Sequence, residues 1–150
     1  MTSPYFNVRH HEHLRIKQKI EKLKISLFNG KLELVKQSRI GKKILRLSKG
    51  YTAKSVALNK QDWQEFEHLI IQFFPELYQL IAEATSRSSV VSFRLCMLSF
   101  FKLSTKTEAF MLEKTDVAIR QNLSRLRKSF NIDHSNDLFS FYEMHEEGTG

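Results

Sequence analysis

Apolar residues recur every three or four positions along most of this chain, which is the period of an α-helix with one buried face. In residues 116–130 the row consists of Ile119, Leu123, Leu126 and Phe130. These patterns predict an all-α fold of five or six helices. Further rows of this kind occur in residues 13–34, 38–47, 60–73, 75–81, 93–101 and 138–142.

The N-terminal segment combines helical periodicity with interruptions. Residues 1–12 lack the pattern, and we expect them to be disordered. The row Ile16, Ile20, Leu23 and Leu27 has the four-three-four spacing of a coiled-coil seam, although an amphipathic helix packed on its own domain fits equally well. We expect the Asn29-Gly30 pair to interrupt or weaken this helix, and the tail from residue 146 to fray.

Two domains are predicted. The first, residues 1–57, is a basic helical segment that could act as a coiled coil for dimerisation, and it ends in a linker at residues 50–55. The second, residues 58–145, is a helical bundle in which Asn59 or Lys60 opens a helix and Pro75 begins another. An aromatic cluster at helical spacing is predicted to be core rather than a ligand cage. It consists of Trp63, Phe66, Phe73, Phe74 and Tyr78.

Residues 104–130 are predicted to form two helices joined by a tight turn. Thr105 and Glu108 have the spacing of a capping box at the start of the first helix. The turn is expected at Glu113-Lys114, and Thr115 is the predicted cap of the second helix.

The second helix of this pair has a basic and polar outer face. Five Lys and Arg residues stand against one acid between residues 114 and 131. Amide, hydroxyl and guanidinium groups on one helix face suit the major groove of DNA, although many surface helices carry charge merely because they are solvated. The outer residues are Val117, Gln121, Ser124 and Lys128, flanked by Arg120, Arg125 and Arg127.

Several short motifs in this region match one known family in order and spacing. The motifs are Leu103-Ser104-Thr105-Lys106, Ala109, Leu112, Thr115, Ala118-Ile119 and Arg125-Leu126-Arg127-Lys128. They resemble the DNA-binding domain of LuxR-type (GerE-like) transcriptional regulators. Upstream, Asp62-Trp63, Phe74-Pro75 and Phe93-Arg94-Leu95-Cys96 resemble a Bacteroidetes-type subgroup, often found behind tetratricopeptide repeats and a coiled coil. The resemblance covers roughly residues 36–142. It departs from the family at Glu113, where the turn often has glycine, and at Lys114, where a buried aliphatic residue is usual. It also departs at Glu108, a commonly apolar position, and at Leu123, where the subgroup often has arginine.

The resemblance implies a helix-turn-helix that binds double-stranded DNA as a homodimer, in a regulator or in the cytoplasmic output module of a larger sensor. It places Arg120, Gln121 and Ser124 at the positions that contact bases, with arginine suited to guanine and glutamine to adenine. The residues assigned to DNA phosphates are Lys106, Thr115, Val117, Arg125, Arg127 and Lys128.

Charge is concentrated in the N-terminal segment. Residues 1–60 contain fifteen Lys and Arg residues and three acids. This segment could form a second, sequence-independent contact with DNA, a juxtamembrane segment of an anchored protein, or a solvated face. No apolar run is long enough to span a membrane. We therefore expect a cytoplasmic protein or the cytoplasmic part of a membrane-anchored one.

No catalytic constellation or cofactor motif stands out, so the sequence predicts neither an enzyme nor a small-molecule substrate. His10, His11 and His13 lack further ligands nearby, and we expect no metal site. The lone Cys96 is predicted to be a buried thiol. Two alternative functions remain open: a sigma-factor region-4-like module that serves RNA polymerase, and a protein-interaction module that does not bind DNA.

Overall fold

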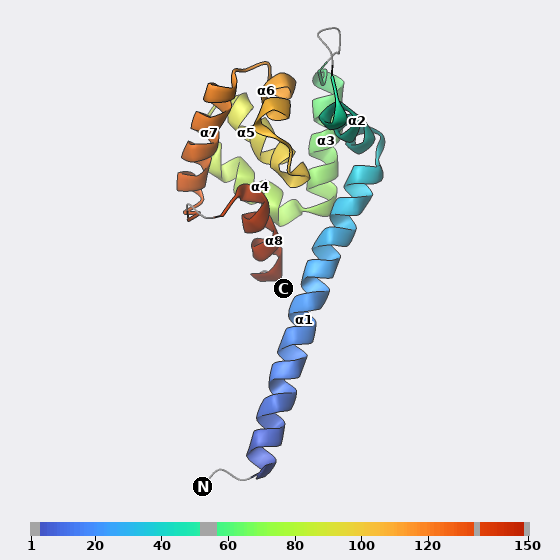
Figure 1. Cartoon of the computed structure of the whole chain (residues 1–150), viewed down its shortest axis with the longest axis vertical. Helices are drawn as coiled ribbons and strands as arrows, with labels where there is room; N and C mark the ends of the chain where they lie inside the picture. Colours follow the sequence, from blue (N-terminus) through green and yellow to red (C-terminus); the bar gives the residue numbers. More distant parts are fainter. Residues whose placement is uncertain (1–3, 52–56, 134–135, 149–150) are drawn as a thin grey trace.

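The computed structural model describes residues 4–51, 57–133 and 136–148. Over these residues the chain forms eight α-helices and one 3-10 helix, without a β-strand (Figure 1). The all-α prediction is confirmed, but five or six helices was too few for the described residues. Helix starts near Ser38 and at Pro75 agree with the sequence pattern. The helices are α1 (Pro4–Gln37), α2 (Arg39–Lys49), α3 (Lys60–Phe73), α4 (Pro75–Ala84), α5 (Val90–Leu98), η1 (Ser99–Phe101), α6 (Thr105–Leu112), α7 (Asp116–Ser129) and α8 (Leu138–Gly148).

Helix α1 is continuous, and its N-terminal half projects from the rest of the fold (Figure 1). The predicted disorder is wrong for residues 4–12, and the helix is not interrupted at Asn29-Gly30. Glycine costs a helix about 1 kcal/mol relative to alanine, and the burial of Phe28 and Leu32 on either side offsets that cost. Extending an existing helix is also cheaper than nucleating one, which favours continuation toward Pro4.

The corner between α1 and α2 depends on a glycine. Ser38 caps α2 by accepting a hydrogen bond from the Gly41 N–H at 3.1 Å. A Cβ atom at Gly41 would lie 2.1 Å from the carbonyl oxygen of Val35, so α2 can approach α1 this closely only without a side chain there. The predicted linker falls after α2, and most of it, residues 52–55, lies outside the described residues.

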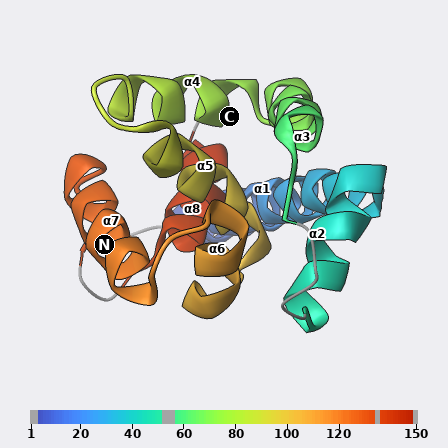
Figure 2. The same cartoon turned by 90° about the horizontal axis from the view of Figure 1, so that it is seen from above.

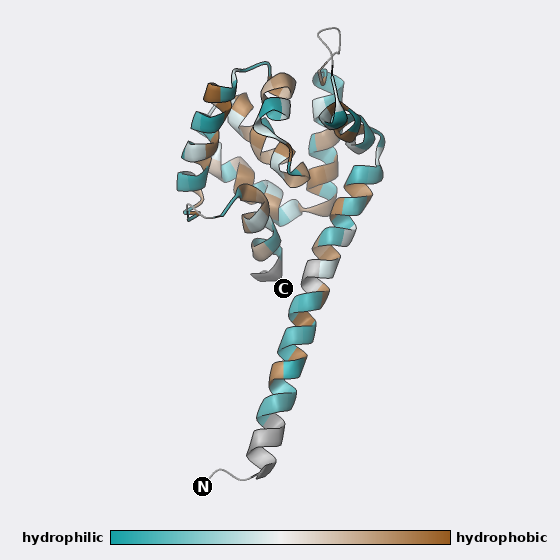
Figure 3. Ribbon diagram, viewed as in Figure 1, coloured by the Kyte–Doolittle hydropathy of each residue, from teal (hydrophilic) through white to brown (hydrophobic). Residues whose placement is uncertain are grey.

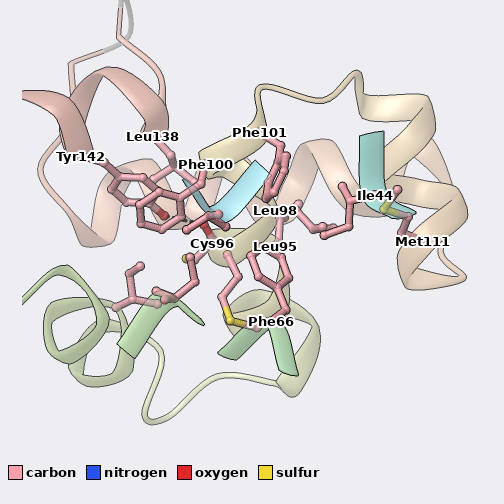
Figure 4. Packing of buried hydrophobic residues seen from close by; sticks show 14 of the residues in the cluster. Ile44, Phe66, Leu95, Cys96, Leu98, Phe100, Phe101, Met111, Leu138 and Tyr142 are labelled. Carbon is pink, nitrogen blue, oxygen red and sulfur yellow. Dashed lines mark hydrogen bonds between the residues drawn. The ribbon is translucent and has the colours of Figure 1, made fainter. Parts of the chain in front are cut away.

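One hydrophobic core joins residues from both sides of the predicted boundary at residues 57 and 58 (Figure 4). Phe28 contacts Phe74 with ring centroids 5.3 Å apart, and Phe100 stacks on Tyr142 at 4.4 Å. Within the predicted aromatic cluster, Trp63 and Phe66 are buried along with Phe74, as core residues should be.

Cys96 is fully buried in this core, as predicted. Burial raises the pKa of its thiol to about 12, which makes it a poor nucleophile. The Tyr142 hydroxyl donates a hydrogen bond to the Cys96 carbonyl oxygen at 2.8 Å and so attaches α8 to α5. Helix α8 continues to Gly148, so the predicted fraying is wrong for residues 146–148. The last two residues lie outside the described residues.

A buried carboxylate ties α2 to α3. Asn59 and Asp62 form a reciprocal capping box at the predicted start of α3. Asp62 also accepts hydrogen bonds from Arg39 at 2.9 Å and from Lys43 at 2.6 Å. Two of the basic residues of the N-terminal segment are therefore paired with an acid inside the fold.

Within the described residues, no helix is both long and apolar enough to cross a lipid bilayer.

Candidate nucleic-acid interface

Helix α6 begins one residue earlier than the sequence predicted, at Thr105. Ser104 has an extended backbone (φ −67°, ψ 153°), and its hydroxyl accepts a hydrogen bond from the Thr107 N–H at 3.1 Å. The capping box predicted for Thr105 and Glu108 is therefore wrong. Because the cap is Ser104, Glu108 is displaced from the capping position and turns inward, where it is only 4% exposed.

The turn between α6 and α7 is tight and lies at Glu113-Lys114, as predicted. Glu113 adopts the left-handed conformation (φ 55°, ψ 43°), which costs a non-glycine residue about 1 kcal/mol. Its N–H bonds to the Phe110 carbonyl at 3.3 Å, and the Lys114 N–H bonds to the Ala109 carbonyl at 3.0 Å. This pair of hydrogen bonds is a Schellman motif, and it ends α6 without a glycine.

Helix α7 starts and packs as its sequence pattern predicts. The Thr115 hydroxyl caps it by accepting a hydrogen bond from the Ala118 N–H at 3.1 Å. Ile119, Leu126 and Phe130 are buried and Leu123 is half-buried, so the predicted apolar row faces the core. These contacts fix the rotation of α7 about its own axis.

The opposite face of α7 is open at the edge of the domain (Figure 3). Arg120, Gln121 and Ser124 are exposed, as the prediction of base-contacting residues requires. Within the described residues, none of these three side chains forms a hydrogen bond or an ion pair. Val117 is 59% exposed on the same face. The face thus offers unpaired hydrogen-bonding groups beside an apolar contact.

Most residues assigned to phosphate contacts are also exposed, and the structure brings them near α7. Lys106, on α6, lines a groove together with Asp116 at the start of α7. Arg127 differs from the others, because it is half-buried and lines a half-open pocket together with residues of α8. The other exposed members are Thr115, Val117, Arg125 and Lys128.

Two residues join this surface that the sequence did not assign to it. Lys114 is exposed in the turn and adds a positive charge, although the resembled family places a buried aliphatic residue there. Tyr51 stacks on Phe110 with ring centroids 4.0 Å apart, and its hydroxyl donates a hydrogen bond to the Lys106 carbonyl at 3.3 Å. Tyr51 lies in the predicted linker, and no local pattern indicates its docking on α6.

The basic residues of α2 do not extend the surface of α7. Helix α2 lies across the domain from α7 in both views (Figures 1 and 2).

Comparison of the chain with models of known protein families, with curated proteins and with solved structures yields no match.

Proposed function

We propose that this chain binds double-stranded DNA through α7 and acts as a sequence-specific transcriptional regulator, either alone or as the output module of a larger sensor. The observation that supports this most is the outer face of α7, where Arg120, Gln121 and Ser124 are exposed and unpaired while the inner face is packed. In this proposal α6, its Schellman turn and α7 form a LuxR-type helix-turn-helix, with α7 in the major groove.

The proposed DNA contacts fall into two groups, contacts to bases and contacts to phosphates. The guanidinium of Arg120 suits the two acceptors of guanine, and the Gln121 amide suits the donor and acceptor of adenine. Lys106, Arg125 and Lys128 neutralise phosphates, which gives affinity without sequence preference. Lys114, in the turn, belongs to this second group.

The test measures the DNA affinity of the parent and two variants by fluorescence anisotropy, on a duplex obtained by binding-site selection and on random duplex. Arg120→Ala should weaken binding to the selected duplex by about 1–3 kcal/mol and relax its base preference. Lys128→Ala should weaken binding to both duplexes alike and reduce the slope of the salt dependence by about one. Lys42→Ala, an exposed substitution on α2, is the matched control and should bind like the parent.

A parent protein that shows no salt-sensitive binding to random duplex at low salt would contradict the proposal and favour the protein-interaction module. Normal binding by both Arg120→Ala and Lys128→Ala, with binding by the parent intact, would instead reject the proposed orientation of α7.

The proposed regulator pairs with a second copy through the projecting part of α1. The row that has coiled-coil spacing is uncovered: Ile16 is 57% exposed, Ile20 46%, and Leu23 and Leu27 63% each. Phe28, by contrast, lies on another face of α1 and packs on the domain. Burying such a seam against a second helix is favourable, and dimers of helix-turn-helix domains bind paired half-sites.

Light scattering tests this pairing. The parent should have twice the 17.7 kDa mass of a single chain, and Leu23→Asp should be monomeric because it places a charge in the seam. Gln18→Asp, which introduces the same side chain on another exposed face of α1, should remain dimeric. Since Lys17 and Lys19 flank the seam, added salt should strengthen the dimer by screening their repulsion. A monomeric parent at all concentrations and salts would contradict pairing through α1.

A further inference from the structure

A cavity of about 290 Å³ lies behind α7, on the side away from the proposed DNA surface. It is a half-open pocket lined by residues of η1, α6, α7 and α8 and of the segments between them. Its volume is at the small end of the range of ligand sites, roughly 300–1,000 Å³. Its lining includes the charged residues Lys102, Glu108 and Arg127 and the apolar residues Leu123, Leu138 and Phe139.

Glu108 is the unusual group in this cavity. It is 96% buried (4% exposed), yet within the described residues its carboxyl group forms no hydrogen bond or ion pair. Burial raises its pKa to about 7. Buried polar groups in native proteins nearly always have partners. Within the described residues, the fully buried side-chain atom without a hydrogen-bond partner is His145 Nδ1, not an oxygen of Glu108. The Glu108 carboxyl group is therefore open to the cavity that it lines, where it is available to a ligand.

Two basic side chains line the same cavity. Arg127 is half-buried, and its guanidinium forms no ion pair within the described residues. The Lys102 ammonium lies 4.3 Å from the centre of the Phe139 ring. The remaining acid, Asp137, already accepts a hydrogen bond from the Ser140 N–H at 2.8 Å at the start of α8. The lining groups without a hydrogen bond or ion pair among the described residues are thus the Glu108 carboxyl, the Arg127 guanidinium, the Lys102 ammonium and the Thr105 hydroxyl, beside an apolar wall.

We infer that this cavity binds an α-amino acid with an apolar side chain. The ammonium group of the ligand donates hydrogen bonds to Glu108, and the ligand carboxylate pairs with Arg127, whose planar fork matches that geometry. Leu123, Leu138 and Phe139 enclose the apolar side chain. Because Leu123 and Arg127 belong to α7, occupancy also biases the position of α7; this regulatory consequence rests on the proposed function, whereas the binding itself does not.

An NMR titration of the DNA-free protein at pH 8 tests the binding, with L-leucine, L-methionine and L-phenylalanine as probes. At least one should shift the amide signals of the cavity residues. For L-leucine, the analogue without a carboxylate is 3-methylbutylamine and the analogue without an ammonium group is 4-methylpentanoate. Each analogue should bind about tenfold more weakly than the amino acid, because each leaves one charged group of the site unpaired.

Two variants localise the site. Glu108→Gln and Arg127→Ala should each weaken binding of the amino acid about tenfold. Glu76→Gln makes the same substitution as the first at an exposed position on α4 and should bind like the parent. The inference is overturned if none of the three amino acids shifts these signals at millimolar concentration, if 3-methylbutylamine binds as tightly as L-leucine, or if Glu108→Gln binds like the parent. The amino-acid titrations use DNA-free protein, so a protein that does not bind DNA would give the same titration results. The proposal of DNA binding and the proposal of amino-acid binding can therefore be rejected independently.

Discussion

Replacement of Asp62 by alanine should lower the free energy of unfolding by about 3 kcal/mol at pH 7. Asp62 is 2% exposed and holds three donors: Lys43 at 2.6 Å, Arg39 at 2.9 Å and the Asn59 N–H at 3.0 Å. The variant loses the cap of α3 and leaves two cations facing each other without their shared anion. Urea denaturation of the parent and the variant measures the difference.

The effect of Asp62 should also depend on pH with a defined sign. Burial by itself would raise its pKa, but hydrogen bonds from Lys43 and Arg39 outweigh burial and lower the pKa from 3.8 to about 2. A carboxyl group whose pKa is lower in the folded state stabilises the protein above its unfolded pKa. That stabilisation is lost as the pH falls through the folded pKa. The parent and Asp62→Ala differ in free energy of unfolding, and part of that difference depends on the Asp62 charge. This part should disappear as the pH falls from 4 to about 2.

Glu65→Ala is the matched control for Asp62→Ala. Glu65 also pairs with Arg39, at 2.7 Å, but its side chain is 42% exposed. Surface ion pairs contribute between about 0 and 1 kcal/mol. Equal losses of stability in the two variants would show that Asp62 does not have the role assigned to it.

The parts of the fold that the sequence predicted are those governed by local rules. The period of Ile119, Leu123 and Leu126 sets the buried face of α7 and hence its open face. Capping chemistry likewise identified the starts of α3 at Asn59 and α7 at Thr115. In each case the residues that decide the outcome lie within a few positions of one another.

The missed features depend on contacts between segments distant in the sequence. Ser104 and Thr105 are adjacent hydroxyl residues with similar capping preference, and only the backbone conformation in the fold selects Ser104. A glutamate in a helix ordinarily indicates a surface position, so local propensity does not predict the burial of Glu108. The resemblance, by contrast, places it at a position that is commonly apolar. The cavity behind α7 is formed by four separate elements, and Tyr51 docks on α6 across a distance of 55 residues. No local pattern contains these contacts.

Replacement of Glu108 by glutamine should raise the free energy of unfolding by about 3 kcal/mol at pH 8. Burial raises the pKa of Glu108 from 4.5 to about 7, so the folded protein holds its proton over a range in which the unfolded chain has lost it. This group therefore favours folding most below pH 4.5, and that advantage is lost as the pH rises through 7. Glutamine occupies a similar volume without a charge, so its variant should not show this loss.

The pH profile distinguishes burial of the Glu108 charge from a general effect of the substitution. Parent and variant should be equally stable at pH 4, and their stabilities should diverge as the pH rises to 8. Lys102, Arg127 and Asp137 line the same cavity, and Tyr142 interacts with Glu108 electrostatically. The pKa of Asp137 is lowered and that of Tyr142 is raised well above 10, so neither changes charge across this range. Glu76→Gln, at an exposed position, should show no such divergence. Urea denaturation at four pH values measures the free energy of unfolding of each protein. If the parent and Glu108→Gln differed by the same free energy at every pH, Glu108 would not be a carboxyl group that ionises in a buried site.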